Sequence, residues 1–463
     1  MASLALRRRA DSLFTKAFTG EGMDYRRVLA IFLPVLVDQA FVSCMNLFNT
    51  AMVSTSGMAA VSAVNMVDSL NFLLVSIFIA ISTGGTVIVA QYKGNGDDKM
   101  VPKAAGGSIS ATFLFAFAVS ALVLIFHREA LLVLFGTAPP DVMKNAQIYL
   151  LGSGASYCGI AVEEGVCGAM RGVGHTRSSL LLSVEMNASY MLLNLLFINA
   201  LHMGVVGLAI SVNIARYGAA AVSLFFILKI DTHVRAKLRD IIRIRFSMVK
   251  KVLTVGLPFA MEQIFFNSGK ILTQTFIVQL GTYALATNAI CMSMSAIYQI
   301  PANALSLTAI TVVGQSMGRR NLVDARKFTR SFLFAASAFY ILAGALLLPL
   351  FKPMVSLFSP PPQIVPTILL ILCIHLGMSV LLWPNSFLRA ACLRAAGDSK
   401  FTSVASMLSM WFFRVVMGYV LAITLHIGIF GVWLAMDMEW GVRGVIFFVR
   451  YRGRKWYEHH LID

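Results

Sequence analysis

Residues 33–41 read LPVLVDQAF, and residues 257–265, which lie 224 positions later, read LPFAMEQIF. The two stretches share Leu-Pro, Gln and Phe at matching places, and Asp38 in the first corresponds to Glu262 in the second. At offsets of 224 or 223 residues the match continues with Gly57 and Gly281, Gln91 and Gln315, Gly94 and Gly318, Arg171 and Arg394, Gly174 and Gly397, and Gly204 and Gly428. Chance produces a few such pairs, but a sustained register indicates an internal repeat.

The composition excludes an ordinary soluble protein. Of 463 residues, 58% are hydrophobic and 13% charged, and the mean hydropathy is +0.77, whereas soluble proteins carry about 25% charged residues. Apolar segments long enough to span a bilayer lie near residues 28–52, 62–92, 104–126, 145–170, 178–200, 203–228, 252–279, 284–315, 331–351, 363–388, 402–425 and 427–449. The sequence predicts an all-α polytopic membrane protein with twelve transmembrane helices in two pseudo-symmetric six-helix bundles.

The formal net charge of +17 reports topology rather than nucleic-acid binding. The bases occur in short stretches between apolar segments, with no stripe on a polar domain, so nucleic acid is not an expected partner. Arg128, Lys144 and Lys352 fall in outer loops, four bases lie within spans, and the other 31 share the side of the N-terminus. This bias places both termini in the cytoplasm, and no signal peptide is evident before Val28.

The same orientation divides the chain into five parts: a cytoplasmic N-terminal segment (1–27), a six-helix lobe (28–228), a basic cytoplasmic linker (229–251), a second six-helix lobe (252–449) and a cytoplasmic tail (450–463). The linker is interpreted as a solvated loop, with lipid or nucleic-acid recognition as the alternative. Both lobes contain an even number of spans, so they enter the membrane in the same sense. Two equal bundles around a cleft favour a transporter, which we expect to act as a monomer in the lipid bilayer.

Twelve charged residues fall within the predicted spans: Asp38, Asp68, Glu163, Glu164, Glu185, Glu262, Asp437, Glu439, Arg216, Lys270, Arg414 and Arg443. At roughly 3 kcal/mol for each charge near the bilayer centre, the eight acids would cost roughly 24 kcal/mol in lipid, more than the about 5 to 15 kcal/mol of typical net stability. They must face protein or water. The first lobe holds five acids and one base, so its interior attracts cations, and a proton and a cationic substrate can compete there.

In the first lobe, Asp38 shares one helical face with Met45 and Asn49 and follows Pro34 by one turn. Because proline permits a helix to bend, protonation of Asp38 is a candidate coupling event; a packed structural acid is the alternative. Asp68 lies in a polar stripe with Asn65 and Asn71, for which interhelical hydrogen bonding is the alternative role.

Glu163 and Glu164 follow a face of small residues that allows close helix approach, formed by Gly152, Ala155 and Gly159. Adjacent positions point about 100° apart, so one of the two glutamates is expected to reach the interior, and the sequence does not decide which. Glu185 on the next span completes the acidic candidates of this lobe.

In the second lobe, Glu262 takes the place of Asp38 beside a polar stripe that contains Lys270. Lys270 is either a permanent ion-pair partner or an internal cation that is displaced during transport. Glu439 and Arg443, four residues apart, predict a structural pair.

The cysteines and histidines suggest no cofactor. The six cysteines lie in apolar segments without CxxC spacing, so neither a disulfide nor a zinc site is implied. The eight histidines are scattered without ligand spacing inside a span. A membrane-embedded enzyme, which needs a cluster of catalytic groups, is therefore the weakest alternative, and the protein is expected not to be an enzyme.

The motifs taken together resemble the multidrug and toxic compound extrusion (MATE) family, and the resemblance covers nearly the whole chain. Its marks are Leu33-Pro34, the segment 89–97 (VAQYKGNGD), the segment 171–176 (RGVGHT), and the second-half segments 313–318 (VGQSMG) and 394–398 (RAAGD). The resemblance implies a bacterial inner-membrane antiporter that exports amphipathic organic cations and is driven by inward movement of H+ or Na+. We expect H+ as the coupling ion, with Na+ as the alternative.

One departure from the family concerns the coupling site. Many members carry an Asp where this chain has Asn49, so Asp38, three turns earlier, is the candidate replacement. A flippase for a lipid-linked saccharide is the alternative function. Its anionic cargo would favour a basic cavity, which the acidic first lobe does not predict.

Overall fold

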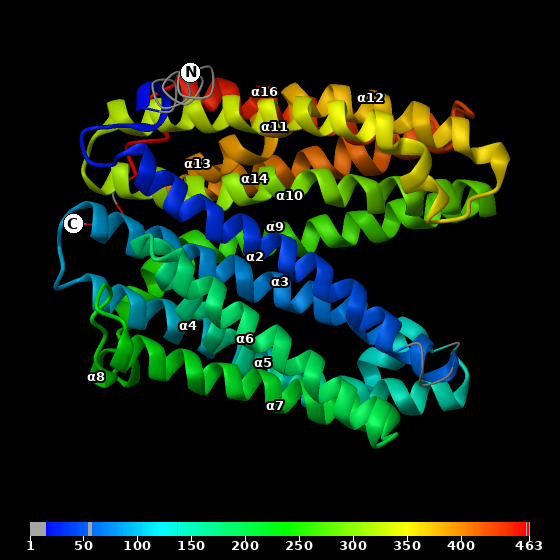
Figure 1. Cartoon of the computed structure of the whole chain (residues 1–463), viewed down its shortest axis with the longest axis horizontal. Helices are drawn as coiled ribbons and strands as arrows, with labels where there is room; N and C mark the ends of the chain where they lie inside the picture. The colour runs from blue at the N-terminus through cyan, green and yellow to red at the C-terminus, as the bar shows by residue number, and fades with distance from the viewer. Residues whose placement is uncertain (1–14, 54–57, 137, 460, 463) are drawn as a thin grey trace, which may run out of the picture. The chain divides into compact units, whose positions relative to one another are not determined.

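The computed structural model describes residues 15–53, 58–136, 138–459, 461 and 462 of the chain. Within them the chain forms helices and their connections, with no named strand. Figure 1 shows the long helices lying side by side within each half of the chain.

Twelve long helical segments account for this architecture, several of which pass through π-helical turns. They are α2 (Tyr25–Val53), α3 (Met58–Gly94), α4 (Val101–Phe135), α5 (Pro140–Val173), α6 (Thr176–Asn194) with η2 (Leu195–Ala200), α7 (Gly204–Phe225) with η3 (Phe226–Ile230), α9 (Phe246–Gln279), α10 (Thr282–Gly318), α11 (Leu322–Ser356), α12 (Val365–Trp383) with η5 (Pro384–Leu388) and α13 (Arg389–Ala395), α14 (Ser399–Ser409) with η6 (Met410–Val416), α15 (Met417–Tyr419) and η7 (Val420–Thr424), and α16 (Ile429–Arg452). The predicted twelve-helix fold is confirmed.

Nine of these segments, counted over the described residues, are long and apolar enough to cross a membrane. The other three are α5, α9 and α16, which have 34, 34 and 24 residues. These three carry Glu163 and Glu164, Glu262 and Lys270, and Asp437, Glu439 and Arg443, respectively. The three less apolar helices are therefore the ones that carry most of the charged residues of the predicted spans.

The chain forms two compact units. The N-terminal unit consists of Leu33–Ala260, and the C-terminal unit of Met261–Leu461 together with the segment that ends at Phe32. The early segment is fixed to α11 by two hydrogen bonds, from Lys327 Nζ to the Thr19 carbonyl (2.6 Å) and from Ser331 Oγ to the Ala17 carbonyl (2.5 Å). In α2 and α9, which are the matching helices of the repeat, the boundary between units falls shortly before Asp38 and Glu262.

In the N-terminal unit α5 is the central helix, packed along α3, α4 and α7. Its glycines permit this approach: a Cβ on Gly168 would lie 2.3 Å from the Ser82 hydroxyl, and one on Gly172 would lie 2.8 Å from the Val89 side chain, both on α3. A Cβ on Gly159 would lie 2.8 Å from the Arg216 backbone of α7. Gly159, a member of the predicted small-residue face, thus brings α5 close to α7, whereas Gly168 and Gly172, which lie outside that face, bring it close to α3.

In the C-terminal unit, α16 packs against α12, η5, α14 and η6, and α10 packs against α11 and α13. Large aromatic side chains fill the interior, among them the fully buried Trp383, Tyr340 and Phe447. Charged side chains of α16, namely Asp437, Glu439 and Arg443, are buried in the same interior.

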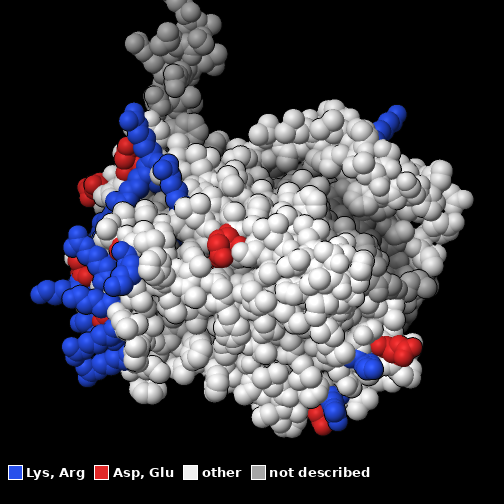
Figure 2. Space-filling view, turned by 60° about the horizontal axis from the view of Figure 1, so that its bottom comes forward, with Lys and Arg blue, Asp and Glu red and all other residues white. Residues whose placement is uncertain are grey.

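Charged side chains are unevenly distributed over the face of the molecule shown in Figure 2. Figure 2 shows Lys and Arg side chains concentrated along one edge of the face in view, while most of the rest of that face carries no charge. In the linker, the short helix α8 (Leu238–Ile242) lies against α4, where the Ser110 hydroxyl donates to the Ile241 carbonyl (3.4 Å). The linker therefore packs onto the end of the N-terminal unit.

Candidate functional site

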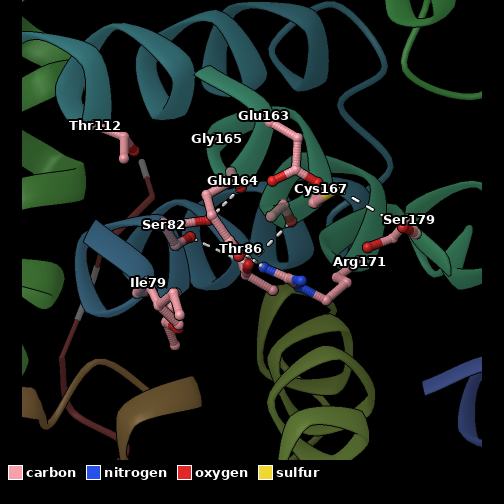
Figure 3. Close-up of polar contacts among 12 residues, drawn as sticks. Ile79, Ser82, Thr86, Thr112, Glu163, Glu164, Gly165, Cys167, Arg171 and Ser179 are labelled. Carbon is pink, nitrogen blue, oxygen red and sulfur yellow. Dashed lines mark hydrogen bonds and ion pairs between the residues drawn. The ribbon is translucent and has the colours of Figure 1, made fainter. Parts of the chain in front are cut away.

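Three carboxylates and one guanidinium form an acidic cluster in the N-terminal unit: Asp38 on α2, and Glu163, Glu164 and Arg171 on α5. Figure 3 shows the α5 members together with the hydroxyl side chains of α3 that hold this part of the helix. Sequence analysis selected all three acids but assigned Arg171 to a cytoplasmic loop. In the structure only 14% of the Arg171 side chain is exposed.

Glu163 is buried, and no basic side chain in the described part of the chain is bonded to it. One oxygen, Oε1, accepts a hydrogen bond from the Cys167 thiol (3.1 Å), one turn along α5. The other, Oε2, is buried without a hydrogen-bond partner among the described residues. An ionised carboxylate in such a place is costly unless a proton or a cation neutralises it.

Glu164, by contrast, pairs with Arg171 two turns along the same helix, with 3.1 Å between Oε2 and Nη2. The surrounding backbone is held by α3: the Ser82 hydroxyl donates to the Glu164 carbonyl (2.6 Å) and the Thr86 hydroxyl to the Gly168 carbonyl (2.9 Å). The adjacent glutamates therefore differ in role, because Glu164 is neutralised by a fixed base and Glu163 is not.

Asp38 completes the cluster from α2. It is half-buried, lies beside the Ser183 hydroxyl of α6, and interacts electrostatically with Arg171 and Glu164. Its Oδ1 is buried and accepts no hydrogen bond from the described residues. With all groups ionised, three negative charges would share one positive charge, so the cluster has room for an added proton or cation.

Asp68 belongs to a second polar group, formed by α3, α5 and α7. Its Oδ1 accepts hydrogen bonds from the Tyr149 hydroxyl (2.8 Å) and the Asn71 amide (3.2 Å), and Arg216 interacts with it electrostatically. The residue is nonetheless exposed, as is Asn65. Asp68 is thus hydrogen-bonded to another helix and also accessible. This arrangement is compatible with both roles that the sequence left open, namely coupling or substrate binding and interhelical hydrogen bonding.

Two other predicted residues contribute less to either group. Glu185 on α6 is half-buried; its Oε1 accepts a hydrogen bond from Ser189 (3.2 Å), and its Oε2 is buried without a partner among the described residues. The side chain of Asn49, the residue at the family's usual acid position, lies outside the described residues, although its backbone continues α2.

In the C-terminal unit Glu262 is held by Arg394, which sequence analysis had counted among the cytoplasmic bases. One guanidinium nitrogen of Arg394, which is buried in α13, lies 2.8 and 2.6 Å from the two carboxylate oxygens. In the internal repeat, Glu262 corresponds to Asp38 and Arg394 corresponds to Arg171. Proton binding at Glu262 would have to compete with this fixed ion pair.

The predicted pair of Glu439 and Arg443 is present (2.9 Å), and Arg414 adds a second guanidinium at 2.8 Å. Sequence analysis missed a further pair, because its members lie on different helices: His375 on α12 and Asp437 on α16, with 2.7 Å between Nδ1 and Oδ1. The His375 ring also contacts Trp433 and Trp440, at centroid distances of 4.8 and 4.9 Å. Each of these acids in the C-terminal unit therefore has a basic side chain beside it.

Lys270 is the exception among the bases. It is exposed, and its Nζ lies 4.8 Å from the centre of the Phe266 ring. Within the described part of the chain it forms no ion pair with a carboxylate. This arrangement suits the displaced-cation interpretation of Lys270 better than the permanent-pair interpretation.

Comparisons with known proteins find relatives over nearly the whole chain. The family model MatE matches residues 34–198 and 258–420, one match in each half. An uncharacterized transporter of Bacillus subtilis, YisQ, is 25% identical over 461 residues, which cover 98% of this chain and 97% of YisQ. A probable multidrug resistance protein of Thermotoga maritima, NorM, is 22% identical over 435 residues, or 93% of each chain. A crystal structure of a MATE protein in the bent conformation has a TM-score of 0.84 at 18% identity, covering 92% of this chain and 94% of the other.

Proposed function

Because the chain belongs to the MATE family of membrane transporters, we propose that it exports amphipathic organic cations in exchange for protons. The observation that carries this proposal is the acidic cluster, in which Asp38, Glu163 and Glu164 share a single guanidinium, that of Arg171. Relatives named as multidrug resistance proteins support the drug-like cargo. The likeness to a solved MATE protein supports the alternating-access fold.

The cluster supplies what an antiporter requires. A proton bound at Asp38 or Glu163 removes negative charge from the interior of the unit, whereas its release restores an anionic surface that attracts a cation. Proton and substrate then bind in alternation, and each weakens the binding of the other. Asp68, which is exposed and lies on α3, would be the carboxylate that meets the organic cation.

The surroundings favour a proton over sodium. Besides the Glu164 and Asp38 carboxylates, the neighbours of Glu163 are the Cys167 thiol, which bonds to it directly, and the Arg171 guanidinium, whereas a hard metal cation prefers a shell of oxygen ligands without a fixed positive charge. A fixed positive charge at Arg171 would also repel Na+. A proton needs only one unpaired carboxylate oxygen, and Glu163 and Asp38 each have one among the described residues.

Helix α2 would connect proton binding to conformation. Pro34 lies inside α2, one turn before Asp38, and proline removes a backbone hydrogen bond that resists bending. A solved MATE protein is known in a bent conformation. We infer that protonation of Asp38 shifts α2 between straight and bent forms, in a bacterial inner membrane with both termini in the cytoplasm.

The test is an efflux assay in cells that lack other drug exporters, with Asp38→Asn, Glu163→Gln and the control Glu129→Gln, which changes an exposed acid at the end of α4. We expect the first two to abolish dye resistance at wild-type protein levels and the control to retain it. In proteoliposomes, efflux should follow an imposed pH step and not a sodium step. If transport by Asp38→Asn still follows the pH step, Asp38 is not the coupling residue. If efflux follows a sodium step instead, the coupling ion is Na+ and not H+.

The flippase alternative makes a different prediction. It would require a cavity that attracts an anionic headgroup, and the acidic cluster argues against this. If a lipid-linked saccharide, and no organic cation, raised the melting temperature of the purified protein, the cargo assignment would be wrong while the transporter fold would stand.

A further inference from the structure

Two histidines and an aspartate meet where the linker begins, away from the acidic cluster. His175 immediately precedes α6, in the turn that follows α5, and Asp231 and His233 follow the end of η3. All three belong to the N-terminal unit. The sequence separates His175 from the other two by more than fifty residues, so spacing alone gave no sign of the group.

The ligand atoms converge on one point. Asp231 Oδ1 lies 3.5 Å from Nδ1 of His175 and 3.6 Å from Nδ1 of His233. The two imidazole rings stack, with centroids 3.9 Å apart and 25° between their planes. Two ligands of one tetrahedral zinc ion, each about 2.0 to 2.1 Å from the metal, lie roughly 3.4 Å apart, so the observed separations fit a shared ion with small adjustments.

Asp231 provides a second, independent indication. Its side chain is completely buried, and Oδ1 has no hydrogen-bond partner among the described residues. The other oxygen, Oδ2, accepts from the backbone amides of His233 (3.0 Å) and Val234 (2.6 Å), which fixes the carboxylate. A buried, oriented and unpartnered oxygen between two imidazoles is what a metal ligand requires.

The groups around the site allow binding from the solvent side. The His175 and His233 side chains are 35% and 51% exposed, which leaves room for water ligands. The Ser178 hydroxyl lies 3.0 Å from His175 Nδ1, a hydrogen bond that a metal ion would replace. Arg177 also interacts electrostatically with His175. Arg177 is the charge that weakens cation binding here.

Another His–Asp contact in the protein serves as a contrast. In the C-terminal unit Asp398 accepts from His459 (3.1 Å), but both of its oxygens are also bonded by Arg450, at 2.7 and 3.1 Å. A carboxylate occupied by a guanidinium has no position for a metal ion. His459 is therefore a natural control for His233.

We propose that His175, Asp231 and His233 bind a divalent transition-metal ion, with Zn2+ as the best match to two imidazoles and a carboxylate. The bound ion connects the α5–α6 turn to the start of the linker, and so fixes the linker on the N-terminal unit. This site is separate from the carboxylates assigned to transport.

The test uses untagged, full-length protein treated with a chelator and titrated with Zn2+ against a fluorescent zinc indicator. We expect one Zn2+ per chain for the wild-type protein, at least tenfold weaker binding for His233→Ala and for the isosteric Asp231→Asn, and unchanged binding for His459→Ala. Co2+ in place of Zn2+ should give visible absorption bands that His233→Ala removes.

A second readout follows the linker itself. Zn2+ should slow trypsin cleavage after the exposed Arg235 at least threefold in the wild-type protein and leave His233→Ala unaffected. No zinc binding by the wild-type protein, or equal binding by His233→Ala and Asp231→Asn, would overturn the proposal. Matched melting temperatures of all variants without metal would show that the variants are folded.

Discussion

The two halves of the repeat differ in whether their acidic side chains are paired with bases. In the C-terminal unit, Glu262 is paired with Arg394, and Glu439 with Arg414 and Arg443. In the N-terminal unit, Asp38 and Glu163 each keep a buried oxygen without a hydrogen-bond partner among the described residues. The acids described here are thus paired with bases in the C-terminal unit, whereas in the N-terminal unit two of them keep an oxygen without such a partner among the described residues.

A single position explains much of the difference. In the register that matches Arg171 to Arg394, Glu164 corresponds to Phe387. Arg394 has no acid two turns before it on its own helix and bonds instead to Glu262. Arg171 pairs with Glu164, so Asp38, at the place of Glu262, has no direct ion pair within the described residues. Glu164, an acid that the C-terminal unit lacks at the matching position, therefore takes the guanidinium that would otherwise be available to Asp38.

The largest effect should come from Glu439→Gln. This change leaves Arg414 and Arg443 buried without their shared carboxylate, which should lower the free energy of unfolding by about 3 to 5 kcal/mol. Thermal melting of the purified variant, followed by size-exclusion chromatography, measures this. Wild-type stability would show that the C-terminal pairs are not required.

Glu262→Gln should have a smaller but clear effect, about 2 to 4 kcal/mol, because one buried guanidinium loses its partner. The double variant Glu262→Gln with Arg394→Met should recover part of that loss, since removing both charges leaves no unpaired ion. A melting experiment on the two variants side by side distinguishes an ion pair from simple packing. Additive losses in the double variant would contradict pairing.

Glu164→Gln should make the N-terminal unit resemble the C-terminal one. Arg171 loses its partner on α5, and Asp38 becomes the nearest carboxylate to neutralise it. We expect about 1 to 2 kcal/mol of destabilisation, together with loss of pH-driven efflux because Asp38 no longer exchanges its proton. Normal efflux by this variant would show that Glu164 does not keep Arg171 from Asp38.

The smallest effect is expected for the exposed pair of Lys93 and Asp98, which lie 3.0 Å apart. The hydrogen bond and charge of Lys93 lower the pKa of Asp98. Any stabilisation is therefore present at neutral pH and lost as the pH falls below the usual range of an aspartate. The melting temperature of Asp98→Asn should match that of the wild-type protein within error from pH 7 to pH 4. A clear difference would show that surface pairs matter here.

The sequence predicted the helices and the acids better than their partners. Apolar length and the repeat were sufficient for twelve helices, because both are local signals. The pairing of Glu262 with Arg394 was missed because the residues are 132 positions apart and Arg394 was counted among the cytoplasmic bases. The same holds for His375 and Asp437, which are 62 positions apart.

Other contacts could have been read from the sequence. Glu164 and Arg171 are seven residues apart, which is two helical turns, so their pairing follows from helix periodicity once α5 is extended to Val173. Which of Glu163 and Glu164 reaches a transport cavity stays a prediction; the structure adds that Glu164, and not Glu163, is paired with Arg171 within the described residues.

The glycines of α5 also limit how the N-terminal unit can rearrange. A helix in near-backbone contact with three neighbours cannot rotate or slide without separating all of them, so we expect α5 to stay stationary through a transport cycle. Glu163 and Arg171 would then keep their positions, and displacement of α2 alone would change their distances to Asp38. Movement of α2 relative to the stationary α5 would then determine when protons exchange with each side of the membrane.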